Sequence, residues 1–402
     1  MKKIFFTLFV LALSATSSSA KDRTEREMQS IASKRLGLSM STMATKAVNT
    51  AVKKVSESKQ LAVYNSKGRG FVVIAKDDDF APVLGYSDTD YDVDAIPCGL
   101  KWWMSQVEKS LEVRKAHAQT YQPAVYASST ATNFITTSWN QQAPYNTLCP
   151  EIDGVAAPTG CVATAMAQIM YYYKYPATSK GTGIYSVTTY KDKNDKEGTT
   201  KWSKRELGHT YEWTKMKNKY LRPTGDTDNA VATLMADAGA ASRMNYRAAA
   251  SGTIEWYAAK GFAENFRYDS LAISCLQRDF YTDAEWMEMV RKEMEAKQPV
   301  LYCGSDEIDG GHAFLLDGIQ SDGKVHVNWG WSGSGNGWYD INILQPKSYN
   351  GSALSSGNGF NIEQSMVLGF KKQETPNADE ENISQWVTDG YSFYISDNEL
   401  HV

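Results

Sequence analysis

The order of the apolar patterns over residues 134–372 constrains the fold of this chain more than any other feature of its sequence. Before Pro299 the apolar residues recur at helical spacing, as in residues 159–175, where the pattern stops just before Pro176. After Pro299 the pattern changes to short apolar runs separated by glycine-rich loops, which is typical of strands. Helices followed by strands, without a sustained alternation of the two, predict the α+β class. The predicted strands cover residues 300–303, 312–318, 324–329 and 337–343.

Two further helices and one long loop are predicted in this region. Residues 229–239 carry apolar side chains on one helical face, and the Thr-Asp-Ala-Glu sequence from residue 282 is a capping box that opens a helix. Residues 180–200 are polar and lack an apolar period, which predicts a loop.

Residues 21–118 carry a smaller pattern of the same class. It consists of helical spacing at both ends and β-rich runs between them, two of which flank a Lys-Gly-Arg-Gly turn typical of a hairpin. Residues 119–133 have no apolar period and are rich in Thr, Ser, Ala and Gln, which predicts an exposed linker of the kind that proteases cut. The predicted elements are helices at 21–60 and 100–118 and strands at 60–65, 70–75 and 82–86.

Residues 1–20 have the composition of a secretory signal peptide. Lys2 and Lys3 precede a mostly apolar run of ten residues, and the Ser-Ser-Ala sequence ending at Ala20 fits a small-x-small cleavage site. The run is too short to span a membrane, and a cytosolic amphipathic start is the alternative. We therefore expect a secreted or periplasmic product that carries no membrane span.

Charge and cysteine content narrow the function classes. Lys and Arg number 42 against 46 Asp and Glu, so nothing in the charge balance favours a nucleic acid or an anionic membrane as partner. An odd number of cysteines leaves at least one thiol unpaired, and the lack of a Cys-x-x-Cys pair argues against a structural zinc site. A free-thiol enzyme is therefore worth testing. The five cysteines are Cys98, Cys149, Cys161, Cys275 and Cys303.

Cys161 is the cysteine best placed to act as a nucleophile. Thr159 is a good N-cap, which would put Cys161 in the first turn of the helix that follows. The unpaired N–H groups and the dipole at a helix start favour the thiolate form. A small buried cysteine is the structural alternative, and its placement alone does not decide between the two.

His312 is the best candidate for the proton-transfer partner that a thiolate needs. It follows two glycines, which leave room for a substrate backbone, and it opens a predicted strand. His326 lies in the next predicted strand, and a core histidine is the structural alternative for both. Asn328 can orient an imidazole from a neighbouring strand, which gives a Cys–His–Asn arrangement. The amides of Gln141 and its neighbours could serve an oxyanion, although a glutamine pair in a loop is by itself a weak signal.

Taken together, these segments resemble the streptopain-type cysteine peptidases of family C10. The resemblance rests on the nucleophile, histidine, asparagine–tryptophan and glutamine segments, and it continues upstream into a stretch similar to the family's propeptide. Any one of these motifs alone would be far less specific than the combination. The segments are residues 160–170, 310–314, 326–331, 139–146 and 70–87.

The resemblance implies an α+β, papain-like catalytic domain, with a helical part and an antiparallel β part, behind a small α+β inhibitory prodomain. It implies a secreted zymogen of the virulence type, which (auto)proteolytic removal of the prodomain would activate. The acidic tail departs from the family pattern. The implied divisions are a signal peptide at 1–20, a prodomain with its exposed linker at 21–125, a catalytic domain at 126–372 and the tail at 373–402.

The resemblance also implies a role for each candidate site residue. The implied mechanism is a thiolate–imidazolium pair that cleaves peptide bonds through a thioester, with no metal or organic cofactor, and its partners are protein or peptide substrates and the chain's own prodomain. Two other functions stay open: a Cys/His amidase that acts on cell-wall peptides, and a non-catalytic binding protein on a peptidase fold. The implied roles are nucleophile for Cys161, general base and acid for His312, oxyanion donor for Gln141, orientation of the imidazole for Asn328, shielding of that contact for Trp329, substrate backbone contact for Gly311 and pocket lining for Thr253.

Overall fold

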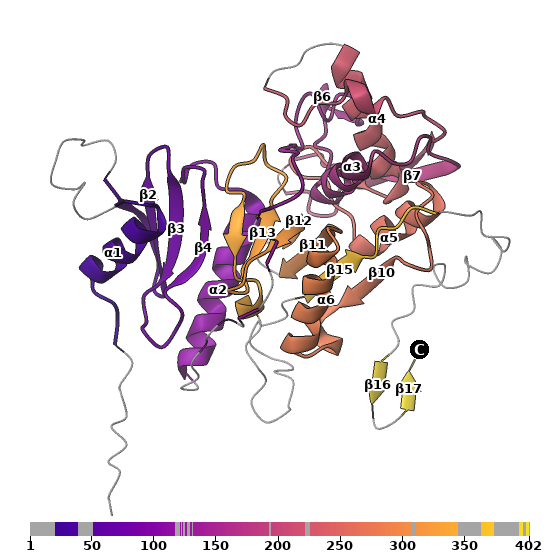
Figure 1. Cartoon of the computed structure of the whole chain (residues 1–402). Helices are drawn as coiled ribbons and strands as arrows, with labels where there is room; N and C mark the ends of the chain where they lie inside the picture. Colours follow the sequence, from indigo (N-terminus) through magenta and orange to yellow (C-terminus); the bar gives the residue numbers. More distant parts are fainter. Residues whose placement is uncertain are drawn as a thin grey trace, which may run out of the picture.

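The computed structural model in Figure 1 describes most of the chain between residues 21 and 373 and a short hairpin near the C-terminus. The predicted signal peptide and most of the acidic tail lie outside the described residues. Within the tail, β16 (Tyr394–Ser396) pairs with β17 (Glu399–His401). The described residues are 21–38, 51–116, 121, 123, 125–126, 129–130, 132–192, 194–221, 226–306, 310–344, 363–373, 394–396 and 399–401.

The N-terminal unit is a four-stranded antiparallel sheet between two helices. Alternate strand residues face opposite sides, so Val63 and Val73 pack against α2 whereas Tyr64 and Val72 pack against α1. The predicted hairpin and third strand are confirmed. The helix predicted over residues 21–60 is partly wrong, because its end forms an edge strand that hydrogen-bonds to β2. The elements are α1 (Glu25–Arg35), β1 (Lys53–Glu57), β2 (Leu61–Ser66), β3 (Gly70–Ala75), β4 (Val83–Ser87) and α2 (Cys98–Ala116).

Among the described residues, the helical part of the second unit has three helices in one core and two antiparallel hairpins, and a fourth helix packs on the sheet face that carries α2. The helices predicted at residues 159–175, 229–239 and 283 onward are confirmed, and the last of them opens on the predicted capping box. The loop predicted over residues 180–200 is partly wrong, because the β-branched residues at both of its ends pair as a hairpin. The elements are β5 (Glu151–Ile152), β6 (Val155–Ala156), α3 (Cys161–Tyr173), β7 (Thr182–Thr189), β8 (Thr199–Glu206), η2 (Trp213–Lys215), α4 (Asp226–Ala241), β9 (Asn245–Tyr246), α5 (Glu255–Glu264) and α6 (Asp283–Glu295).

The strands predicted after Pro299 form an antiparallel sheet, as expected. Two further strands, β10 and β15, lie at its edge and did not stand out in the sequence. The mixture of helices and antiparallel sheet confirms the α+β class. The elements are β10 (Ser274–Gln277), η3 (Arg278–Phe280), β11 (Val300–Asp306), β12 (Gly310–Ile319), β13 (Val325–Asn328), β14 (Gly337–Tyr339), η4 (Asn342–Leu344) and β15 (Glu363–Leu368).

One continuous sheet joins the two units. Its strand order is β1-β2-β3-β4-β14-β13-β12-β11-β15-β10, and the junction is the antiparallel pair β4 and β14. Figure 1 shows α2 lying across this junction. The two strands approach closely at Gly337, where an added Cβ would lie 2.8 Å from the Cα of Ser87. The N-terminal unit is therefore bound to the second unit by backbone pairing as well as by side chains.

The two faces of this sheet belong to different hydrophobic cores. Ala313 and Leu315 of β12 pack with α3, α4 and α5, whereas Phe314 and Leu316 pack with α2 and α6. Alternation along β12 therefore assigns each residue either to the helical part or to the face that carries α2. This assignment decides which candidate site residues can meet.

The segment before the helical part is held along the sheet by backbone hydrogen bonds. The N–H groups of Tyr126, Thr130 and Phe134 donate to the carbonyls of Ser321 (2.7 Å), Ile319 (2.9 Å) and Asp317 (3.1 Å). We call the described residues between 126 and 134, namely 126, 129–130 and 132–134, the strap. The predicted linker is thus attached to the second unit over its C-terminal part.

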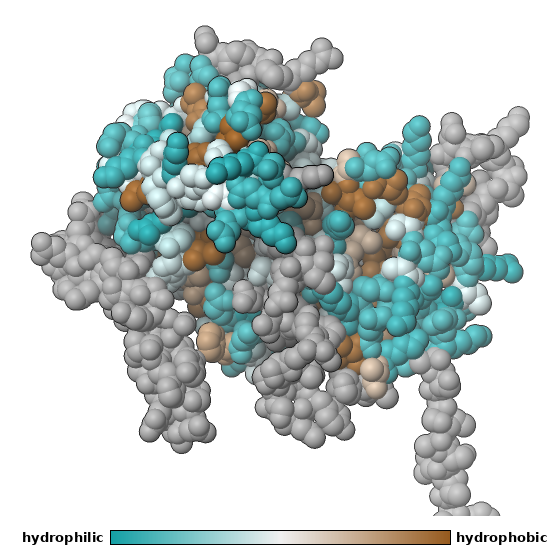
Figure 2. Space-filling view, turned by 180° about the vertical axis from the view of Figure 1, so that it is seen from behind, coloured by the Kyte–Doolittle hydropathy of each residue, from teal (hydrophilic) through white to brown (hydrophobic). Residues whose placement is uncertain are grey.

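The described surface is coloured by hydropathy in Figure 2. The face seen in Figure 2 is mostly hydrophilic, with hydrophobic residues in scattered groups. No helix within the described part of the chain is both long enough and apolar enough to cross a bilayer.

Candidate active site

The start of α3 holds Cys161 at the first helical position, as predicted. The N-cap, however, is Gly160, so the prediction of Thr159 as cap is wrong. The Thr159 hydroxyl instead hydrogen-bonds to the hydroxyl of Thr164 at 2.8 Å. Gly160 has a φ of +86°, and an added Cβ would lie 2.6 Å from Cε of Met244, so this position favours glycine both by conformation and by space.

The thiol of Cys161 lies against strand β12. Its Sγ accepts a hydrogen bond from the backbone N–H of Ala313 at 3.4 Å. Burial raises the pKa of the Cys161 thiol, and the N–H groups of Ala313 and Val162 oppose this rise without cancelling it. Loss of hydration therefore acts against the thiolate form of Cys161, whereas the hydrogen bonds from these N–H groups favour it.

His312 lies directly before Ala313 on β12, and Ala313 is the residue whose N–H contacts the Cys161 thiol. It pairs with Gly304 of β11 and shares a face of the sheet with Phe314, the face that packs against α2. Asn328 pairs with Leu315 and so lies on the opposite face, toward α3. The structure thus brings His312 and Asn328 into neighbouring strands, as predicted, but places them on opposite faces of the sheet.

Asn328 is fixed by buried hydrogen bonds. Its Nδ2 donates to the carbonyl of Thr137 at 2.8 Å and to Oε1 of Gln168 at 3.2 Å, and its Oδ1 accepts from the N–H of Gly330 at 3.1 Å. Gln168 was not singled out from the sequence. The signal was available, because a polar residue seven positions after Cys161 lies on the same face of a largely apolar helix.

Gln141 lies beside the start of α3. Its carbonyl accepts from the N–H of Thr159 at 3.0 Å, and its N–H donates to Oδ1 of Asn140 at 2.6 Å. The side chain is buried, so this glutamine is not a surface residue. Asn140 in turn donates to Oγ of Ser332 at 2.9 Å, which connects this segment to the loop after β13.

Trp329 is buried beneath the first turn of α2. Its ring lies 4.8 Å from that of Phe314, and a Cβ added at Gly99 of α2 would lie 2.7 Å from its Cε3. Trp102, one turn further along α2, lies so close to Gly304 that a Cβ there would overlap its ring. Because Gly304 is the cross-strand partner of His312, the N-terminal unit covers the sheet face on which His312 lies.

The two predicted substrate-binding residues differ in their surroundings. Gly311 is exposed and pairs with Ser305 of β11. The hydroxyl of Thr253 donates to the carbonyl of Ser242 at 2.5 Å, so it is already occupied. The segment that contains Thr253 nevertheless lies beside the nucleophile, because a Cβ at Gly160 would be 3.2 Å from the carbonyl oxygen of Ser251.

His326 has a different environment from His312. Its Nδ1 lies 2.5 Å from Oδ1 of the fully buried Asp317, and its ring lies 5.3 Å from that of Trp338. Asp317 also accepts from the N–H of Ile135 at 2.8 Å. These contacts are those of a core histidine that holds β12, β13 and the residue after the strap together.

Comparison with known proteins identifies the chain. Residues 139–339, which contain Cys161, Gln141, His312 and Asn328, match the peptidase C10 family. The chain belongs to this family. Residues 17–111 match the Spi protease inhibitor family, which agrees with an inhibitory unit in front of the C10 peptidase region. The predicted family, a streptopain-type cysteine peptidase, is confirmed.

Two curated relatives support the assignment to C10. The thiol protease/hemagglutinin PrtT of Porphyromonas gingivalis is 32% identical over 395 residues, which cover 92% of this chain. The chain spans 44% of the length of that relative. Streptopain of Streptococcus pyogenes is 31% identical over 334 residues, which cover 77% of this chain and 80% of streptopain.

Two solved structures of C10 peptidases resemble the fold. A fragment of prointerpain A from Prevotella intermedia matches 81% of this chain and 99% of its own length, with 32% identity and a TM-score of 0.68. Active interpain A from the same organism matches 63% of this chain and all of its own length, with 35% identity and a TM-score of 0.51. The likeness supports the papain-like catalytic domain and its prodomain.

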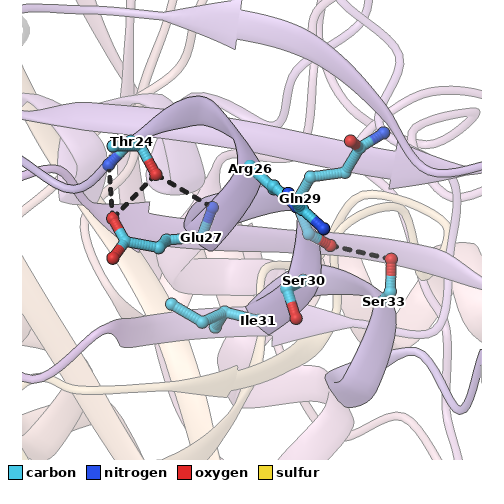
Figure 3. Close-up of a pocket in the computed structure, with 7 residues that line it drawn as sticks. All are labelled: Thr24, Arg26, Glu27, Gln29, Ser30, Ile31 and Ser33. Carbon is cyan, nitrogen blue, oxygen red and sulfur yellow. Dashed lines mark hydrogen bonds between the residues drawn. The ribbon is translucent and has the colours of Figure 1, made fainter. Parts of the chain in front are cut away.

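Two other features of the described structure, a hollow along α1 and a cluster of three aspartates, contain none of the candidate catalytic residues. Figure 3 shows a hollow along α1, where Thr24 and Glu27 form a reciprocal capping box. Among the described residues, Asp77, Asp78 and Asp79 are the acidic groups close enough together to hold a metal ion. Two of them already have partners, because Asp77 pairs with Lys115 at 2.8 Å and Asp78 accepts from the N–H of Lys21 at 2.8 Å. The hollow is lined by Thr24, Arg26, Glu27, Gln29, Ser30, Ile31 and Ser33.

Proposed function

We propose that this chain is the secreted zymogen of a cysteine endopeptidase that acts on proteins and peptides. One observation carries the proposal: the N–H of Ala313 donates to the Cys161 thiol, so the residue next to His312 already touches the nucleophile. A rearrangement at the start of β12 would then bring the imidazole of His312 to the sulfur. The arrangement is that of a thiol nucleophile with a histidine partner.

The reaction follows from these positions. The Cys161 thiol passes its proton to His312, and the sulfur attacks the peptide carbonyl. The side-chain amide of Gln141 and the N–H of Cys161 stabilise the oxyanion that develops. His312 protonates the leaving amine, which releases the first product and leaves a thioester. Water then hydrolyses the thioester with His312 as base, which restores the thiol.

The N-terminal unit is proposed to keep the enzyme inactive. Gly99 and Trp102 of α2 contact Trp329 and Gly304, which places the helix on the face that carries His312. Asn328 lies on the other face, toward α3. Removal of residues 21 to about 125 would uncover the first residues of β12 and allow the imidazole to turn toward Cys161. Burial raises the pKa of the Cys161 thiol in the present form, which is consistent with latency.

Export is proposed from residues 1–20, which have a positive start, an apolar run and a small-residue cleavage site. Curated relatives of the chain are thiol proteases, and its proposed partners are protein substrates and its own prodomain. The function proposed here needs no cofactor.

The proposed function is tested by labelling the matured enzyme with a thiol-directed epoxide and mapping the modified peptide. We expect one label, on Cys161, and complete loss of casein hydrolysis in proportion to labelling. Hydrolysis of small cell-wall peptides with casein left intact would instead support an amidase. Labelling without hydrolysis of either substrate would support a non-catalytic binding protein.

The position of the maturation cut is a further prediction. The sequence alone places the new N-terminus between Lys115 and Phe134. Since the strap is hydrogen-bonded to the second unit and α2 ends at Ala116, we expect the mature enzyme to begin between residues 117 and 126. Cys161→Ala should accumulate as the uncut precursor. N-terminal sequencing of the matured wild type checks this, and a start within residues 60–100, or full activity without any cut, would contradict the prodomain assignment.

A further inference from the structure

We propose that Gln168 is a positioning residue for the peptidase reaction. Its side-chain oxygen holds the amide of Asn328 in the orientation that accepts an N–H from the imidazole of His312. The proposal rests on the proposed function, since it needs His312 to act with Cys161.

Gln168 lies on the same helix and the same face as the nucleophile. Seven residues are nearly two turns of an α-helix, so Gln168 follows Cys161 by about 10 Å along the axis of α3. Its side chain is buried between this helix and the sheet. One rigid element therefore carries both the sulfur and the amide that reaches Asn328.

The oxygen of Gln168 is the meeting point of three segments. Oε1 accepts from Oγ1 of Thr137 at 2.8 Å, from Nδ2 of Asn328 at 3.2 Å and from the N–H of Trp139 at 3.5 Å. Thr137 and Trp139 belong to the segment that leads into Gln141, and Asn328 ends β13. Gln168 thus joins the proposed oxyanion segment, the nucleophile helix and the asparagine.

These contacts fix which end of the Asn328 amide points where. Nδ2 has two hydrogens, and its two partners, Oε1 of Gln168 and the carbonyl of Thr137, are both acceptors. Turning the amide over would place Oδ1 against two acceptors and Nδ2 against the N–H of Gly330, which is strongly unfavourable. The observed orientation is therefore the one that Gln168 and Thr137 enforce.

This orientation leaves an acceptor for the histidine. Oδ1 of Asn328 accepts from the N–H of Gly330 at 3.1 Å, and an amide oxygen has room for a second donor. An imidazolium offers only N–H donors, so the group that orients it must be an acceptor. Because Asn328 is already set while His312 lies on the other face of the sheet, Gln168 prepares the site before the histidine reaches it.

The test uses Gln168→Met in the matured enzyme, because methionine keeps the length of the side chain and removes the oxygen. We expect kcat to fall by about 10- to 100-fold, the scale of a misplaced catalytic group, with little change in KM. Gln364→Met is the matched control. Gln364 is also buried and accepts from the hydroxyl of Tyr302 at 2.5 Å, but it lies on β15, outside the hydrogen bonds of Asn328. It should lose thermal stability to a similar degree and keep the kcat of wild type.

A double-mutant cycle with Asn328→Ala separates positioning from general stability. If Gln168 acts through Asn328, the double variant should be no slower than Asn328→Ala alone. Losses that multiply, or a Gln168→Met enzyme with wild-type kcat and only a lower melting temperature, would overturn the proposal.

Gln168→Glu carries the test if the methionine variant does not fold, because it keeps an oxygen at the same place. Its kcat should stay within about tenfold of wild type, and a loss as large as that of Asn328→Ala would overturn the proposal. Failure of the proposed function is recognised separately, since wild type itself would then show no thiol-dependent peptide hydrolysis.

Discussion

Cys161→Ala is expected to lower kcat/KM for peptide hydrolysis by roughly 10⁶-fold and to leave the chain folded. The side chain contributes one hydrogen bond to the fold, from the N–H of Ala313 at 3.4 Å, so its removal changes little besides the chemistry. The prodomain of this variant should be removed with an added protease, because self-cleavage is lost. Hydrolysis of a fluorogenic peptide gives the rate, and thermal unfolding verifies the fold.

The other four cysteines are the controls for this variant. Burial raises the pKa of the Cys98 and Cys275 thiols to about 12 and that of Cys149 to about 11, so these side chains are protonated and poorly nucleophilic at neutral pH. Burial also holds the pKa of Cys303 well above its usual value. Each should be replaceable by alanine with hydrolysis retained. Strong activity in Cys161→Ala, or its loss only in one of the other four variants, would show that the nucleophile is a different cysteine.

The local parts of the site could be predicted from the sequence because they depend on neighbours in the chain. The glycine before Cys161 and the position of Cys161 at a helix start follow from residues 158–175 alone. The strand that contains His312 could likewise be predicted from its own residues. Thr159 was nevertheless the wrong cap. Its hydroxyl hydrogen-bonds to the hydroxyl of Thr164, and Gly160, which has a positive φ, is the N-cap of the helix.

The relation between His312 and Asn328 could not be predicted from the sequence. Which face of a sheet a residue occupies depends on the register between strands, and the ladder between β12 and β13 is irregular between Leu316 and Ile319. A shift of one residue moves a side chain to the opposite face. The sequence placed the two residues in adjacent strands, but it contained no information about this irregularity.

Contacts between distant segments were missed for a related reason. Pairing of β4 with β14 joins residues about 250 positions apart, and the sequence of neither strand indicates which strand it pairs with. The role of Gln168 could not be predicted because polar residues are common in helices. Only its hydrogen-bond donors, which come from distant segments, distinguish it. Residues 53–57 were predicted to be helical because their few apolar positions fit the spacing of a helix as well as that of a strand. Pairing with β2 makes them a strand.

His312→Ala is expected to lower kcat/KM by about 10⁴- to 10⁶-fold in the matured enzyme, because His312 is the group proposed to take up the proton of Cys161 and return it to the leaving amine. The fold should be kept, since His312 lies near the start of β12 at a partly exposed position and the strand is paired with β11 through its backbone. Steady-state hydrolysis of a peptide, together with the rate of thiol alkylation, measures the loss.

His326→Ala is the matched variant, since it removes the same ring from the adjacent strand. Its ring is nearly buried, with Nδ1 2.5 Å from the fully buried Asp317, so the change leaves a carboxylate oxygen without its partner. Unfolding in urea should show a loss of about 1–3 kcal/mol, and kcat/KM of the folded enzyme should fall by no more than a modest factor. The reverse order, with activity lost in folded His326→Ala and kept in His312→Ala, would mean that the histidine beside Asp317 performs the proton transfer. The start of β12 would then have no part in the chemistry, and the contact of Ala313 with Cys161 would be structural.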